Sequence, residues 1–293
     1  MSKKPMLKNK YLILTLFLVI LTFFILTSIF DLKISKLINE NLNKTWFTSI
    51  FDTYGRICLF FPIYLFLFIF LLKFLSYLKI NRNAKIVYVI LFSLIYFASI
   101  TIFLYFKKQF SFKNNSFDIS KFSFSIFLLV LLVIFIIFVN IYLRYLFDSE
   151  NNYINIYFQQ ALSATIFISL LFINVGIFKI LFGRNRPYDV LIEEENFQWL
   201  LQINFSKIRG SSFPSGHTAA AGAMLSLIYF LDNKRVSKII LTTCIFSLIL
   251  LTGISRVLML KHFLTDVLFS ILLVSIYYFL SKIIVKKIYE RKK

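Results

Sequence analysis

An all-α, polytopic bundle of transmembrane helices is the fold class that this sequence predicts, on three observations. Of the 293 residues, 59% are hydrophobic and 19% aromatic, and the mean hydropathy of +0.80 lies well above that of soluble domains. The apolar residues come in runs of about 20, the length at which a helix crosses a bilayer. Most of the 33 Lys and Arg lie in loops and tails between these runs. We therefore expect an integral membrane protein.

Eight apolar runs are candidate membrane spans, within a range of six to eight. The sixth and seventh runs are short, so their ends are the hardest to place. The first run lacks a small-residue cleavage site and is expected to be a retained helix. The eight predicted spans are Tyr11–Phe30, Ile57–Leu78, Ile86–Phe106, Phe122–Phe147, Ile154–Phe182, Ser215–Leu231, Ile239–Ile254 and Phe263–Ile284.

The formal net charge of +20 indicates contacts with anionic membrane lipids and not with nucleic acid, because the basic residues flank the spans. Four lysines in Met1–Lys10 predict a cytoplasmic N-terminus by the positive-inside rule. With eight spans the basic tail Lys286–Lys293 returns to the same side. We expect a plasma membrane or a bacterial inner membrane, with both termini in the cytoplasm and the loops after the fifth and seventh spans, where the candidate active site lies, facing the exterior or periplasm.

The chain divides into two parts by its use of special residues. Six of the seven glycines and both histidines lie after residue 175, so the backbone is specially shaped in the last third. We expect residues 1–150 to form N-terminal transmembrane helices and residues 151–293 to carry the working site. Within the first part, residues 31–56 have helical apolar spacing and Trp46, which predicts an interfacial helix that is either a lip for lipids or a connector.

The chemical residues of the last third begin with His262 and Asp266. If Phe263 opens a helix, the two stand four residues apart on one face, and the carboxylate can orient the imidazole. Taken alone, such a pair is more often a structural hydrogen bond. The other histidine, His217, follows a Pro-Ser-Gly turn into a helix, and Arg256 supplies a fork for paired anionic oxygens. An anionic ligand is therefore expected.

Further cations stand at the end of the fifth predicted span. Gly183 and Pro187 break the helix there, so Lys179 and Arg186 can turn toward one point, whereas Arg184 is expected to reach the membrane interface instead. The sixth span begins at Ser215 and Gly216, where free backbone N–H groups and the helix dipole favour an anion. No cysteine or carboxylate spacing indicates a metal site, and Cys58 and Cys244 predict no disulfide.

These residues together resemble the three-part signature of the type-2 phosphatidic acid phosphatase family, which is related to the vanadium haloperoxidases. The resemblance covers roughly residues 155–285 and matches every signature position. Members in membranes usually have six spans, so the first 150 residues have no family-based interpretation. The three parts are Lys179-x6-Arg186-Pro187, Pro214-Ser215-Gly216-His217 and Ser255-Arg256-x5-His262-x3-Asp266.

The resemblance implies roles for these positions. His262 would be the nucleophile that carries a phosphohistidine, with Asp266 orienting it, and His217 would be the general acid and base. The residues that would bind the substrate phosphate are Lys179, Arg186, Ser215, Gly216 and Arg256. No metal and no other cofactor is expected, because amino acid side chains supply the cations.

The predicted function is that of a membrane lipid phosphatase whose partner is a lipid phosphate or pyrophosphate. The family suggests undecaprenyl pyrophosphate, phosphatidylglycerophosphate, phosphatidic acid or a lipid A phosphate as substrates. One alternative is a phosphotransferase that passes the same phosphoryl group to an acceptor alcohol. Another is a transporter of an anionic solute, which the clustering of charges at one interface disfavours.

Overall fold

A computed structural model describes residues 22, 24, 25, 27–40, 46–78, 80–106, 119–143, 153–200, 202–204, 211–231 and 235–291. The described part of the chain is helical, without strands, as the sequence predicts. A first helical stretch covers residues 27–40. The labelled helices are α2 (Trp46–Ile57), α3 (Phe60–Tyr77), α4 (Arg82–Phe106), α5 (Ile119–Leu143), α6 (Tyr153–Phe182), α7 (Pro187–Ile192), α8 (Gly216–Ala223), the 3₁₀ helix η2 (Met224–Phe230), α9 (Arg235–Leu258) and α10 (Leu264–Glu290).

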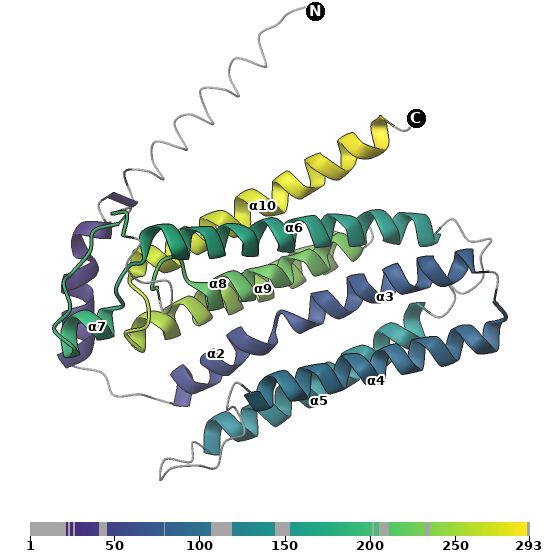
Figure 1. Ribbon diagram of the computed structural model, residues 1–293, viewed down its shortest axis with the longest axis horizontal. Coiled ribbons are helices and arrows are strands. Elements are labelled where there is room, and N and C mark those ends of the chain that lie inside the picture. Colours follow the sequence, from purple (N-terminus) through teal and green to yellow (C-terminus); the bar gives the residue numbers. More distant parts are fainter. Residues whose placement is uncertain are drawn as a thin grey trace, which may run out of the picture.

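The long helices run side by side along the longest axis of the molecule (Figure 1). Helix α6 packs against α3 on one side and α10 on another, and α8 packs against α9 and α10. Helix α2 contacts α5, α8 and α9, so the N-terminal part of the chain reaches into the C-terminal part. Helices α4 and α5 form the outer layer beyond α3 (Figure 1).

Five helical segments among the described residues are long and apolar enough to cross a membrane. They are Trp46–Tyr77, Arg82–Leu104, Ile154–Ile192, Val236–Leu258 and Leu264–Glu290. Helix α5 contains a shorter apolar helix, Ser125–Ile141, and the sixth predicted span is α8 continued by η2. Most of the first predicted span, Tyr11–Phe30, lies outside the described residues. These helices suggest an integral membrane protein, in agreement with the composition.

The predicted interfacial segment at 31–56 consists of two helical pieces. Residues 27–40 lie across one end of the bundle, beside α7 (Figure 1). The second piece, α2, is followed after a turn at Cys58 and Leu59 by α3, and it packs against other helices of the bundle. The sequence predicts one interfacial segment here because polar residues occur throughout 31–56. In α2 the polar residues face α8 and α9 inside the bundle, so they do not mark a helix that lies on the surface.

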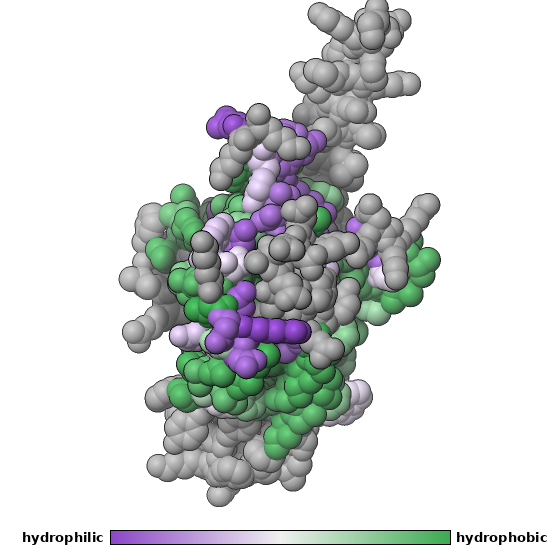
Figure 2. All heavy atoms as spheres, turned by 90° about the vertical axis from the view of Figure 1, so that its right-hand side faces the viewer, coloured by the Kyte–Doolittle hydropathy of each residue, from purple (hydrophilic) through white to green (hydrophobic). Residues whose placement is uncertain are grey.

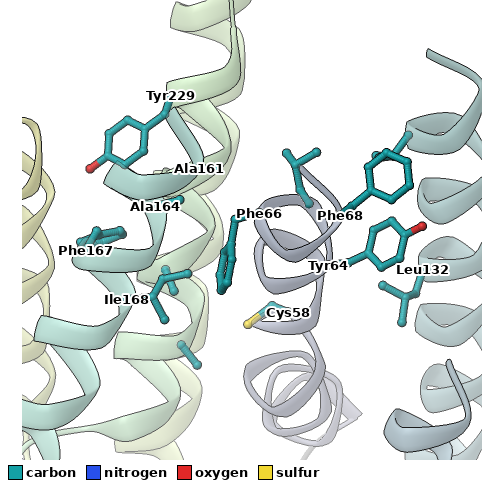
Figure 3. Packing of buried hydrophobic residues seen from close by; sticks show 14 of the residues in the cluster. Cys58, Tyr64, Phe66, Phe68, Leu132, Ala161, Ala164, Phe167, Ile168 and Tyr229 are labelled. Atoms are coloured by element: carbon teal, nitrogen blue, oxygen red, sulfur yellow. The ribbon is translucent and has the colours of Figure 1, made fainter. Parts of the chain in front are cut away.

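The core is continuous across the two parts of the chain because α3 lies between α6 and α5. Phe66 points from α3 toward α6, where Ala164 leaves room, whereas Tyr64 and Phe68 point toward Leu132 of α5 (Figure 3). All five side chains are buried. The Tyr64 hydroxyl finds polar partners on α4 and α5, as a buried phenol requires.

The two ends of the bundle differ in what they expose. Figure 2 shows the end opposite α7, where hydrophilic residues gather between hydrophobic flanks. Lys286 and Glu290 near the end of α10 form an exposed pair with a 3.7 Å separation. The end that carries α7 instead holds a group of buried charged residues, Asp31, Asp52, Arg184, Arg256 and Asp266.

Two glycines set the close approach of α8, α9 and α10. A Cβ added to Gly222 would lie 2.3 Å from Cγ2 of Val274, and one added to Gly253 would lie 2.5 Å from Cγ1 of Val267. Small residues let membrane helices approach in this way. The helix ends that hold the signature residues depend on this spacing.

We expect Gly222→Ala to destabilise the protein by about 1–3 kcal/mol, because the added methyl group overpacks the contact with Val274. Thermal unfolding in detergent would measure the loss. Gly176→Ala is the matched control, since a Cβ there meets nothing within 4 Å. The double variant Gly222→Ala/Val274→Ala should recover much of the stability. Equal stability of the two single variants would contradict this interpretation.

Candidate active site

The signature residues come together at one end of the bundle, where α6 and α9 end and α8 and α10 begin (Figure 1). Lys179 at the end of α6 donates from Nζ to the carbonyl oxygen of Ser211, over 2.7 Å. Its Cε would lie 3.9 Å from a Cβ built on Gly216, the first residue of α8. The N–H of Ser215 donates to the carbonyl oxygen of Asp266 on α10, over 3.2 Å.

Local backbone chemistry ends and begins these helices. Helix α6 stops at Gly183, whose φ of 46° is the left-handed conformation common after a helix. Pro187 then opens α7 at a position where its missing N–H costs nothing. Both breaks confirm the prediction from sequence. Ser215 caps α8 by accepting a hydrogen bond from the N–H of Thr218, so its hydroxyl is engaged in the cap.

His262 is buried, with 4% of its surface exposed, and its ring is held by the backbone. Its Nδ1 lies 2.5 Å from the carbonyl oxygen of Ser212, which can only accept. We therefore assign the proton to Nδ1, which leaves the lone pair of Nε2 available. Burial lowers the pKa of His262 to about 4, so the imidazole is neutral at pH 7.

The expected hydrogen bond between His262 and Asp266 is wrong in its detail. Their closest atoms, Nδ1 and Oδ2, are 3.8 Å apart, which is beyond hydrogen-bond distance. Helix α10 begins at Leu264, so His262 precedes the helix and the four-residue face does not apply. Asp266 instead accepts from the N–H of Phe263, over 2.8 Å, and from the Ser212 hydroxyl. Ser212 thus joins the carboxylate to the imidazole.

Arg184 does not reach the membrane interface, contrary to the sequence interpretation. It is 2% exposed and forms ion pairs with Asp266, over 2.6 Å, and Asp31, over 3.0 Å. Its remaining donors contact Gln198 and Thr265, and the guanidinium lies 4.2 Å from the ring centre of Phe263. The cation is retained inside because two carboxylates and two hydrogen bonds replace its hydration.

Three buried nitrogen atoms at this end have no hydrogen-bond partner within the described part of the chain. They belong to Arg186 (Nε), Arg256 (Nε) and His217 (Nε2). Buried donors are almost always paired, so unpaired ones at one site indicate room for a missing acceptor. Arg256 uses its Nη1 for a hydrogen bond to Asp52, which leaves Nε free. Free donors on two guanidinium groups favour an oxyanion as the missing acceptor.

Four residues at the site were not among the predicted site residues. The sequence predicts a place at the interface for Arg184, and it assigns no role to Ser212. Asp31 and Asp52 come from the first 60 residues and are 1% and 4% exposed. A signal for both was present, because carboxylates in apolar segments of a membrane protein are costly and usually functional or paired. The sequence does not show which cations pair with them, because Arg184 and Arg256 are far away in the chain.

The described residues form an all-helical bundle with helices of membrane-spanning length and a buried, cation-rich cluster beside two histidines. Residues 160–289 match a family model described as the PAP2 superfamily. This match agrees with the resemblance of the same part of the chain to the type-2 phosphatidic acid phosphatases. Members of the superfamily are phosphatases, which supports a phosphatase activity in general. A search of curated proteins and a search of solved structures found no match.

We expect Arg184→Gln to reduce the free energy of unfolding by about 3–5 kcal/mol, because it leaves two buried carboxylates without their cation. Thermal unfolding in detergent would measure this loss. The double variant Arg184→Gln/Asp31→Asn should be more stable than Arg184→Gln alone, since one of the two stranded charges is removed.

Lys286→Gln is the matched control for this experiment, because it removes a cation from the exposed pair with Glu290. Exposed pairs contribute little, so no measurable loss is expected. If Arg184→Gln behaved like Lys286→Gln, Arg184 would not hold the buried carboxylates together.

The lowered pKa of His262, about 4, leads to a pH prediction. A histidine with the ordinary value near 6.5 would be about 90% protonated at pH 5.5, and a reaction that needs its neutral form would slow about tenfold. We expect formation of a phosphoenzyme at saturating substrate to fall less than about threefold between pH 7 and pH 5.5. Rapid-quench measurement would test this. A tenfold fall in this rate would contradict the prediction if it were the same for substrates whose phosphate groups have different pKa values, because the fall would then come from the enzyme and not from the substrate.

Proposed function

We propose that the protein is an integral membrane phosphatase that hydrolyses the phosphate or pyrophosphate monoester of a lipid. The observation that carries the proposal is the group of unpaired buried donors on Arg186, Arg256 and His217, at the same bundle end as the backbone-held imidazole of His262. A phosphoryl group has oxygen atoms that can accept hydrogen bonds from these donors and a phosphorus atom that the imidazole of His262 can attack. The match to a superfamily of phosphatases supports the same activity.

The proposed reaction has two steps. In the first, Nε2 of His262 attacks phosphorus, the bond to the lipid oxygen breaks, and His217 gives a proton to that oxygen. In the second, water attacks the phosphohistidine, its proton passes to His217, and the N–P bond breaks to release phosphate. Lys179, Arg186 and Arg256 would hold the phosphoryl oxygens where charge develops.

The first turn of α8 would complete the phosphate site. The N–H groups at the start of a helix have no acceptor within the helix and carry the positive end of its dipole. Gly216 begins this turn and Ser215 caps it. Ser215 would therefore act mainly by setting the start of the helix, with the N–H of Gly216 turned to the anion. Three side-chain cations make a metal ion unnecessary for charge neutralisation, so we propose a metal-independent reaction.

A site at the end of a helix bundle suits a lipid substrate. The acyl or prenyl chains can stay between lipid-facing helices while the phosphate enters at the interface. We place this end on the exterior or periplasmic side, from the positive-inside distribution of Lys and Arg. Undecaprenyl pyrophosphate, phosphatidylglycerophosphate, phosphatidic acid and lipid A phosphate are the candidate substrates.

The purified protein should become labelled when mixed with a lipid phosphate that carries radioactive phosphate, and the label should be acid-labile, as an N–P bond is. His262→Ala should abolish the adduct, because it removes the nucleophile. His217→Ala should slow turnover by about 10²-fold or more, the usual contribution of a general acid. EDTA should leave the wild-type rate unchanged. The four candidate lipids, each assayed in detergent, would identify the substrate.

Cys244→Ser serves as the control, since Cys244 is an exposed residue of α9; it should keep both adduct and turnover. An adduct that survives in His262→Ala would place the nucleophile elsewhere. Full activity of His217→Ala would remove that residue from the mechanism. Adding acceptor alcohols to the assay separates hydrolysis from phosphotransfer by the ratio of phosphate released to phosphate transferred.

A further inference from the structure

Helix α2 brings a buried carboxylate, that of Asp52, to two residues of the signature. Its Oδ1 accepts a hydrogen bond from Nη1 of Arg256 on α9 and lies 3.4 Å from Nε2 of His217 on α8. Its Oδ2 accepts from Arg56, one turn further along α2, over 3.1 Å. The Asp52 side chain is 5% exposed. None of the three signature motifs contains this residue, which precedes the first of them by more than a hundred positions.

Helix α2 also contacts His217 through its backbone. A Cβ added to Gly55 would lie 2.8 Å from Cδ2 and 2.9 Å from Cβ of His217. Gly55 is the one glycine of the chain before residue 176. It stands three residues after Asp52, on the same face of the helix. The ring of His217 therefore rests on α2 with the carboxylate beside one of its nitrogens.

The number of charged groups around Asp52 indicates a role beside a catalytic histidine, because a structural ion pair needs only two partners. A structural Asp–Arg pair satisfies itself, whereas here one carboxylate faces Arg56, Arg256 and the imidazole of His217. Burial and the charge of Arg256 disfavour the protonated imidazole of His217, which is the form that a general acid needs, and the carboxylate of Asp52 opposes both effects. Because Asp52 takes Nη1 of Arg256, the guanidinium is fixed with its unpaired Nε left for another acceptor.

We propose that Asp52 is a positioning residue for the phosphatase reaction: it fixes Arg256 and supports the protonated form of His217 from outside the signature motifs. The inference rests on the proposed function, in which His217 protonates the leaving oxygen. Helix α2 then belongs to the active site, and the N-terminal part of the chain supplies more than a scaffold.

The test compares two leaving groups in the Asp52→Asn variant. Alkoxide from dioctanoyl phosphatidic acid must be protonated as it leaves, whereas nitrophenolate from p-nitrophenyl phosphate is a stable anion that leaves without a proton. If Asp52 supports the acid, Asp52→Asn should slow phosphoenzyme formation from the alkyl substrate by at least about tenfold more than from the nitrophenyl substrate. Rapid quenching of acid-labile label measures both rates.

Asp31→Asn is the matched control. It makes the same chemical change in an equally buried Asp–Arg pair at this end of the bundle, but Asp31 pairs with Arg184 and contacts Thr265. Any loss of rate in Asp31→Asn should be the same for both substrates. A second variant, Gly55→Ala, displaces the His217 ring while leaving Asp52 intact, and it should show the leaving-group-selective loss even if Asp52→Asn does not fold.

Two outcomes would overturn the inference. Asp52→Asn could slow both substrates equally, or not at all, which would make the residue structural. It could also bind inorganic phosphate more tightly and turn over at the wild-type rate, in which case Asp52 occupies the phosphate site and competes with the substrate. Either result leaves the proposed function standing, because wild-type phosphate release is measured in the same assay. Absence of that release would overturn the proposed function itself.

Discussion

One buried guanidinium, that of Arg184, is the interaction on which the arrangement of this end of the bundle depends. It joins Asp31 near the N-terminus to Asp266 at the start of α10, across 235 positions of sequence. In an apolar bundle an unpaired charge is very costly, so each of the three ions requires the others. Once Asp266 is held, it accepts hydrogen bonds from Ser212 and the N–H of Phe263, and the backbone of Ser212 in turn holds His262.

The site is thus built from helix ends, and its rigidity comes from the backbone more than from side-chain pairs. Carbonyl oxygens of Ser211 and Ser212 accept from Lys179 and His262, and the cap of α8 fixes the turn in which His217 lies. Donors that point away from these contacts remain unpaired and buried on Arg186, Arg256 and His217. Preorganised donors of this kind stabilise developing charge without reorganising when the reaction occurs.

The N-terminal part of the chain contributes residues to the site, which its composition does not predict. Asp31, Asp52 and Gly55 all contact residues of the C-terminal part, and α2 packs against α8 and α9. The core is likewise continuous, since α3 packs against α6. The division at residue 150 therefore describes where the signature motifs lie in the sequence. It does not describe the packing, which joins the two parts.

The sequence by itself determined the membrane character, the helical class and the identity of the signature residues, because apolar runs and motif spacing are local properties. It predicted the C-terminal end of α6 at Phe182, since Gly183 and Pro187 act on their own backbone. Only the tertiary structure decided that Arg184 is buried, that Asp266 reaches His262 through Ser212, and that Asp52 stands beside His217. Those contacts join helices far apart in sequence, and which charges meet depends on the close approach that Gly222, Gly253 and Gly55 allow.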